Sequence, residues 1–155
     1  MTREWSGMRL GLGHFRHLLR DLGHPERATP AILVGGTNGK GSTAAMMAAI
    51  LSAAGYRTGL YTSPHLVSYR ERIRIDGRAI PEAAVAAQLK SIGPALERHR
   101  SSFFEAMTAL AMRHFAAESV EVAVYEVGIG GAKDATNAVD PMVSVVVSVG
   151  LDHMD

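Results

Sequence analysis

The sequence predicts an α/β fold in which a mainly parallel sheet is flanked by helices. Short apolar segments alternate along the chain with longer helical segments, a pattern typical of parallel strands joined by helices. The first apolar run leads directly into a glycine cluster, as a buried parallel strand would. The chain has 155 residues, of which 47% are hydrophobic and 20% charged, so it is long enough for one domain with a hydrophobic core.

The first half of the chain predicts two helices and two strands. A helix is expected over residues 5–22, where apolar side chains recur at helical spacing, and Pro25 lies just beyond its end. The apolar run at residues 31–34 and the short run at 58–61 are both expected to be strands. Between them, residues 42–54 are rich in alanine and methionine and indicate a second helix.

Residues 62–80 predict a long loop that ends in a small hairpin. Asp76 and Gly77 form a dipeptide that favours a hairpin turn. Three arginines alternate with other residues just before this turn: Arg70, Arg72 and Arg74. They predict either a solvated hairpin face or guanidinium groups that meet substrate carboxylates, for which their planar fork is suited.

Two helices and two strands are expected in the second half. A helix is predicted over 81–92, ending before Gly93 and Pro94, and another over 102–117. The β-branched run at 120–127 and the valine-rich run at 143–149 predict core strands, and a glycine-bearing loop joins them. Because the sequence stops soon after the last strand, we expect a truncated domain with exposed sheet surface and a tendency to self-associate.

Composition excludes several classes of protein. A net charge of +1, from 16 basic and 15 acidic residues, gives no electrostatic signature of nucleic-acid or membrane binding. The chain has no cysteine, which excludes disulfides and thiolate chemistry. It has neither a signal peptide nor an apolar run of about 20 residues, so we expect a cytoplasmic protein.

The strongest chemical motif is Gly-Thr-Asn-Gly-Lys-Gly-Ser at residues 36–42, between an expected strand and an expected helix. Glycines let backbone N–H groups approach phosphate oxygens, and the helix adds the positive end of its dipole. The motif departs from the usual G-x-x-x-x-G-K-[ST] pattern, because Gly41 occupies the place of the hydroxyl residue. The expected nucleotide-binding residues are Thr37, Asn38, Gly39, Lys40, Gly41, Ser42 and Thr43.

This motif resembles the phosphate loop of the folylpolyglutamate synthase and dihydrofolate synthase family, relatives of the Mur ligases. Mur ligases themselves usually carry threonine directly after the lysine, so Gly41 favours the folate branch. Further segments resemble family motifs in the same order: Tyr-Thr-Ser-Pro-His-Leu at 61–66, Glu-Arg-Ile-Arg-Ile at 71–75, Glu-Val-Gly-Ile-Gly-Gly at 126–131, Asp-Ala-Thr-Asn at 134–137 and Gly-Leu-Asp-His at 150–153.

The resemblance implies a P-loop NTPase-like Mur ligase central domain that uses ATP and Mg²⁺. It implies an ATP-dependent ligase that adds L-glutamate to folate or dihydropteroate through an acyl phosphate. Lys40, Glu126 and His153 then match catalytic positions, and Ser63, Glu126 and His153 match magnesium-binding positions. The position of Glu126 also supports a ligand-binding role, because it ends a predicted parallel strand, where open α/β sheets bind ligands.

Two departures from the family pattern limit these expectations. Ala132 replaces an arginine, and Lys133 follows it one position late. The family's further lysine and its C-terminal domain have no counterpart here, so residues 1–155 are expected to form an incomplete N-terminal ATP-binding domain. We expect little or no turnover from it, and a monomer at full length.

Two other functions stay open at this point. One is a non-catalytic nucleotide-binding remnant, and the other is a Mur-type ligase of peptidoglycan precursors. Composition and spacing also leave open whether a ligase of the folate branch would act on dihydropteroate, on reduced folate or on both.

Overall fold

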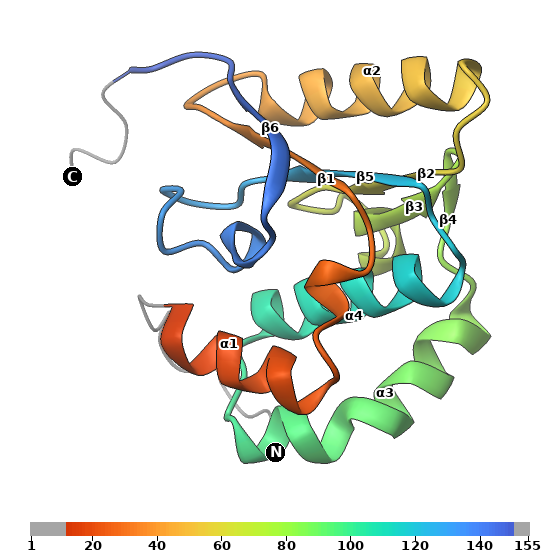
Figure 1. Ribbon diagram of the computed structural model, residues 1–155, viewed down its shortest axis with the longest axis vertical. Helices are drawn as coiled ribbons and strands as arrows, with labels where there is room; N and C mark the ends of the chain where they lie inside the picture. Colours follow the sequence, from red (N-terminus) through yellow and green to blue (C-terminus); the bar gives the residue numbers. More distant parts are fainter. Residues whose placement is uncertain (1–11, 151–155) are drawn as a thin grey trace.

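A six-stranded sheet lies between two layers of helices in the computed structural model, which describes residues 12–150. The strand order is β4-β3-β2-β5-β1-β6. Helix α2 covers one face of the sheet, and α1, α3 and α4 cover the other (Figure 1). The described helices contain none that is both long and apolar enough to cross a membrane.

The parallel part of the sheet consists of β1 (Ala31–Gly35), β2 (Thr58–Tyr61), β5 (Val122–Glu126) and β6 (Pro141–Val146). Strand β5 pairs with both β1 and β2, and β1 pairs with β6 on its other side. The short strands β3 (Ile73–Ile75) and β4 (Arg78–Ala79) extend the sheet in antiparallel fashion from β2. The prediction of a mainly parallel sheet is therefore confirmed.

Four helices pack on this sheet, namely α1 (Leu12–Asp21), α2 (Lys40–Ala53), α3 (Glu82–Arg98) and α4 (Phe103–Ala117). The larger core fills the space between the sheet and α1, α3 and α4, with Tyr61, Phe115 and Tyr125 almost fully buried. A smaller core lies under α2, around Val34 and Val124. The N-terminal part of the expected first helix, residues 5–11, lies outside the described residues.

Helix α4 begins where its sequence predicts. Ser102 is its N-cap, and the Ser102 hydroxyl accepts a hydrogen bond from the Glu105 amide while the Glu105 carboxylate accepts one from the Ser102 amide. Such a capping box satisfies two amides that the helix itself cannot bond. The expected helix over 102–117 is confirmed.

The expected end of α3 at Ile92 is wrong. The helix continues through Gly93 and Pro94 to Arg98. A proline inside a helix costs about 3 kcal/mol because it removes one hydrogen bond and crowds the preceding turn. Residues on both sides of it compensate by burial, since Ile92 is fully buried and Leu96 packs against the main core.

The expectation of a core strand at 143–149 is also wrong. Strand β6 begins at Pro141, ends at Val146 and, among the described strands, pairs only with β1. It is therefore an edge strand, and Val143 and Val146 are 47% and 66% exposed. A valine-rich run predicts burial on both faces, but a strand with one neighbour keeps much of that surface open.

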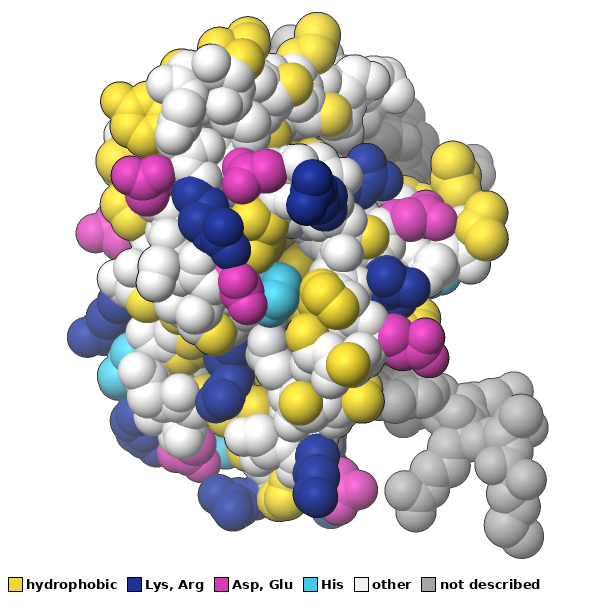
Figure 2. Space-filling view, turned by 90° about the vertical axis from the view of Figure 1, so that its right-hand side faces the viewer, with side chains coloured by type: hydrophobic (Ala, Val, Ile, Leu, Met, Phe, Trp, Pro, Cys, Tyr) yellow, Lys and Arg dark blue, Asp and Glu magenta, His cyan; other side chains and the backbone are white. Residues whose placement is uncertain are grey.

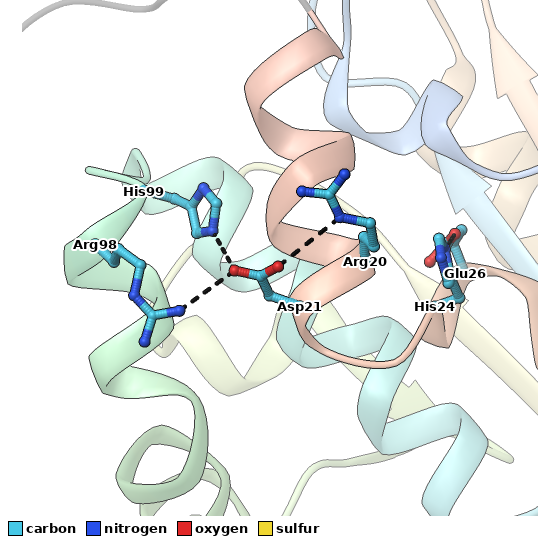
Figure 3. A network of polar contacts seen from close by, with 6 residues as sticks. All are labelled: Arg20, Asp21, His24, Glu26, Arg98 and His99. Atoms are coloured by element: carbon cyan, nitrogen blue, oxygen red, sulfur yellow. Dashed lines mark hydrogen bonds and ion pairs between the residues drawn. The ribbon is translucent and has the colours of Figure 1, made fainter.

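Polar contacts join α1 to the end of α3 on the side of the molecule away from the sheet. The Asp21 carboxylate lies 2.8 Å from His99 Nε2 and 3.3 Å from a guanidinium nitrogen of Arg98 (Figure 3). The hydrogen bond from His99 lowers the pKa of Asp21 below its usual range. On another face, shown in Figure 2, basic and acidic side chains are interspersed, in keeping with the net charge of +1.

Candidate functional site

The candidate site lies where β1, β5 and β6 end at one edge of the sheet. Residues 36–39 form a tight loop between β1 and α2. Gly39 is the N-cap of α2 and has a φ of 80°, a left-handed conformation that glycine adopts without strain. Lys40 Nζ donates hydrogen bonds to the carbonyl oxygens of Gly36, at 2.8 Å, and Thr37, at 3.2 Å.

Helix α2 starts two residues earlier than expected, which places more of the loop at its N-terminus. The amide of Thr43 donates to the Gly39 carbonyl and makes a first-turn bond of the helix. The amides of the preceding residues, Lys40 to Ser42, have no carbonyl one turn earlier to bond. Such amides, with the helix dipole behind them, favour the binding of phosphate oxygens.

Glu126 joins this loop to the segment that follows β2. It ends β5, is 6% exposed, and its Oε2 accepts a 2.9 Å hydrogen bond from the Ser63 amide. Its carboxylate also faces Gly41, where an added Cβ would lie only 3.2 Å from Oε1. Burial raises the pKa of Glu126, while the Ser63 hydrogen bond and the nearby Lys40 lower it.

The structure therefore brings two of the three expected magnesium-binding residues together. Ser63 and Glu126 supply a hydroxyl and a carboxylate, which are hard oxygen ligands suited to Mg²⁺. Because Gly41 has no side chain, the Glu126 carboxylate stays uncovered on the side of the phosphate loop, where a Cβ would lie 3.2 Å from Oε1. His153 lies outside the described residues, and among those that are described no three His, Asp or Glu side chains gather in a way that could hold a metal.

Ser148, which the sequence analysis missed, holds the phosphate loop from its other side. Its carbonyl oxygen accepts from the Thr37 amide at 2.9 Å, and its Oγ accepts from the Asn38 amide at 3.0 Å. The same hydroxyl donates to the Asn38 carbonyl oxygen at 3.1 Å. Thr37 and Asn38 therefore use their amides within the protein. A serine inside an otherwise valine-rich run was the available sequence signal.

The residues of this edge also match a known family. The family model of the Mur ligase middle domain matches residues 34–155. The chain belongs to the Mur ligase middle domain family. The match includes the whole phosphate loop, Ser63, Glu126 and the segment around Ser148, and it agrees with the observed mainly parallel sheet.

Proteins of the folate branch of Mur ligases are among its relatives. The chain is 47% identical over 148 residues to a probable bifunctional folylpolyglutamate synthase/dihydropteroate synthase of Haloferax volcanii, covering 92% of this chain and 18% of that protein. It is 40% identical over 156 residues to a dihydrofolate synthase/folylpolyglutamate synthase of Bacillus subtilis, covering 96% and 36%. The resemblance drawn from the motifs is confirmed.

A solved structure shows the same fold. The folylpolyglutamate synthase of Mycobacterium tuberculosis, complexed with ADP and AMPPCP, superimposes with a TM-score of 0.90 and 42% identity. The alignment covers 95% of this chain and 35% of that one. The chain thus spans about a third or less of the length of these relatives.

In this Mur ligase domain, a groove of about 620 Å³ runs from the phosphate loop along the glycine-bearing loop after β5. Asp134 fixes that loop, because its Oδ2 accepts from the amides of Gly128 and Ile129 at 3.0 and 2.9 Å. Gly128 itself has no room for a side chain, since an added Cβ would lie 2.7 Å from the Phe104 ring. Ala132, which replaces the family's arginine, lines the groove and is exposed.

The arginines before the hairpin do not form a simple solvated face. Arg72 is 9% exposed, its Nε donates to His65 Nδ1 at 2.9 Å, and its guanidinium lies 5.3 Å from the centre of the Phe103 ring. Arg70 and Arg74 donate from Nε to the backbone carbonyls of other residues in this segment. The solvated-face prediction is wrong for Arg72, while recognition of substrate carboxylates stays a prediction.

Proposed function

We propose that this domain binds the phosphates of ATP with Mg²⁺ and forms the nucleotide-binding part of a ligase that adds L-glutamate to folate or dihydropteroate. The observation that carries the proposal is the convergence of the α2 N-terminus, Lys40 and the buried Glu126 carboxylate at one edge of the sheet. The names of the relatives, and the ADP and AMPPCP complexes of the Mycobacterium tuberculosis enzyme, support this substrate class.

In the proposed reaction, the loop amides and Lys40 hold the phosphate chain while a substrate carboxylate attacks the terminal phosphorus. The bond to ADP breaks, and an acyl phosphate forms. The amine of glutamate then attacks the acyl carbon, loses a proton and expels phosphate to leave an amide. Positioned cations and amides stabilise the negative charge that develops on the transferred group.

Ser63, Glu126 and His153 would hold Mg²⁺, which would neutralise charge on the phosphate oxygens. Glu126 also links two loops from different strands, since it accepts from the Ser63 amide while facing Gly41. Its carboxylate therefore lies between the segment that carries Ser63 and the phosphate loop. The cytoplasmic location remains a prediction.

Titration of the chain with Mg-ADP, followed by calorimetry, tests the nucleotide part of this proposal. Lys40→Met is expected to weaken affinity about tenfold or more, because it removes the charge beside the phosphates (about 1.4 kcal/mol per factor of ten). Lys90→Met is the matched control, since Lys90 is an exposed residue of α3. Equal binding by wild type and Lys40→Met would contradict the assigned role of Lys40.

Glutamate-dependent ADP release tests the ligase part and separates it from the two alternatives. Release with a dihydropteroate or folate acceptor supports the folate branch, and release only with a UDP-sugar peptide acceptor supports a peptidoglycan precursor ligase. Nucleotide binding without either activity in a full-length protein would indicate a non-catalytic remnant. The names of the relatives, and Gly41 directly after the lysine, favour the first of these.

A further inference from the structure

We infer that Ser148 is a positioning residue, which holds the phosphate loop in the shape that receives nucleotide phosphates. The inference rests on the proposed nucleotide binding. It assigns to the segment after β6 a role in building the loop between β1 and α2, although the two are 110 residues apart in the sequence. Figure 1 shows this segment beside the loop, where the blue end of β6 meets the orange start of α2.

The backbone of Ser148 approaches the loop so closely that only glycine fits opposite it. Gly36 has a φ of 131°, and a Cβ added there would lie 2.8 Å from the Ser148 carbonyl oxygen and 2.9 Å from its amide nitrogen. Real Cβ atoms do not approach backbone this closely, so any side chain at residue 36 would push the two segments apart. The contact therefore fixes the path of the chain as it leaves β1.

Hydrogen bonds then fix the next two residues of the loop. The Ser148 carbonyl oxygen and hydroxyl satisfy the amides of Thr37 and Asn38, and the hydroxyl also reaches the Asn38 carbonyl oxygen. Two residues further on, the Gly150 amide donates to Thr37 Oγ1 at 3.0 Å. With Thr37 and Asn38 held from outside, the loop presents its remaining amides, at the start of α2, toward a phosphate.

The Ser148 hydroxyl is the part of this arrangement that a substitution removes cleanly. Ser148→Ala keeps the backbone bond to Thr37 but leaves the Asn38 amide without its side-chain acceptor. Each such hydrogen bond is worth a factor of about three to ten, so affinity for Mg-ADP is expected to fall about tenfold. Affinity for pyrophosphate is expected to fall by the same factor, because the loop contacts phosphates rather than the nucleoside.

Calorimetric titration of the 155-residue chain with Mg-ADP and with pyrophosphate tests this inference, using three variants. Ser148→Thr keeps the hydroxyl and is expected to restore binding. Ser91→Ala, in an exposed position on α3, is the matched control and is expected to bind as wild type does. Amide hydrogen exchange adds a local readout, since Ser148→Ala should expose the Asn38 amide while leaving the Thr37 amide protected.

The outcomes separate this inference from the function on which it rests. If the wild-type chain binds neither ligand, the proposed nucleotide binding fails. If wild type binds and Ser148→Ala binds equally well, the positioning role is overturned and the proposed function stands. Thr37→Val is a second variant in case Ser148→Ala proves unstable. It removes the hydrogen bond between the Gly150 amide and Thr37 Oγ1, so it is also expected to weaken the binding of Mg-ADP.

Discussion

At the residue scale, Glu126 shows how one buried carboxylate connects parts of the chain that lie far apart in the sequence. The Ser63 amide that it accepts from is 63 residues away, and Gly41 faces it from a third segment. A carboxylate at this depth is stable only with hydrogen bonds or a nearby positive charge. The Ser63 amide and Lys40 supply both, but burial has the larger effect and raises the pKa of Glu126.

A substitution of Gly41, which faces this carboxylate, should affect Mg²⁺-dependent nucleotide binding more than it affects folding. Gly41→Ala places a methyl group 3.2 Å from Glu126 Oε1, where it would crowd the carboxylate that is expected to bind the cation. Affinity for ADP is expected to fall about tenfold (about 1.4 kcal/mol) with Mg²⁺ present and to change little without it. Calorimetry with and without Mg²⁺ makes this measurement.

Gly93→Ala is the matched control for that experiment. Nothing lies within 4 Å of a Cβ added at Gly93, which is inside α3. Replacing a helical glycine by alanine gains about 0.5–1 kcal/mol of stability, so this variant should unfold at a higher temperature and bind ADP as wild type does. A Mg²⁺-independent loss in Gly41→Ala would show that the methyl group disturbs the loop rather than the cation site.

Sequence patterns located these site residues only in part. The glycines and lysine of the loop were expected from their place between a strand and a helix, Glu126 from its strand end and the family resemblance, and Ser63 from the resemblance alone. Ser148 and Arg72 were not assigned their contacts, because those depend on which strands become neighbours in the sheet. An arginine in an alternating segment predicts exposure, whereas Arg72 is buried against His65 and Phe103.

At the scale of elements, α4 is buried on nearly all sides, and this includes its histidine. His114 is 5% exposed, and burial lowers its pKa below its usual value of 6.5. The Nδ1 atom lies 3.4 Å from Gln88 Nε2 of α3. The folded protein therefore takes up a proton here less readily than the unfolded chain does.

This difference gives the stability of the protein a defined dependence on pH. Between the lowered pKa and 6.5 the unfolded state binds more protons, so the free energy of unfolding should fall as pH is lowered below about 7. His114→Gln removes that proton uptake and should flatten the dependence between pH 7.5 and 5.5. Urea unfolding at a series of pH values measures it, with the exposed His17→Gln as the matched control. An unchanged slope in His114→Gln would contradict the prediction.

The elements themselves were largely predictable. Strands β1 and β2 and helix α4 match their expected ranges closely, because short apolar runs and helical periodicity of apolar residues are strong local signals. The end of α3 was not predictable from the sequence, because the packing of Ile92 and Leu96 overrides the helix-breaking tendency of Pro94. Local preferences of this kind are decided by contacts that a single sequence does not show.

At the scale of the whole molecule, two uncharged surfaces are exposed, one on helix α2 and one on strand β6. Helix α2 carries no charged residue after Lys40, and Met46 and Ile50 are 58% and 68% exposed. The edge strand β6 adds exposed valines, among them Val143. Long apolar edges with unpaired backbone groups favour association between chains.

Self-association of the isolated chain is therefore expected to rise with concentration. Val143→Lys places a charge on the edge strand, which should lower the apparent mass at high concentration at a modest loss of stability, because Val143 is already half exposed. Light scattering over a concentration series, after gel filtration, makes the comparison. If the variant and wild type associate equally, the contact lies elsewhere, and α2 becomes the next surface to change.

The strand order also has a consequence for the time course of synthesis. The phosphate loop leaves the ribosome early, but its partner Ser148 follows 110 residues later. At about 5–20 residues per second, this leaves the loop without its outer support for roughly 5 to 20 seconds. During that interval the hairpin extending from β2 can already form from neighbouring residues, so nucleotide binding should appear only after the residues around Ser148 have emerged.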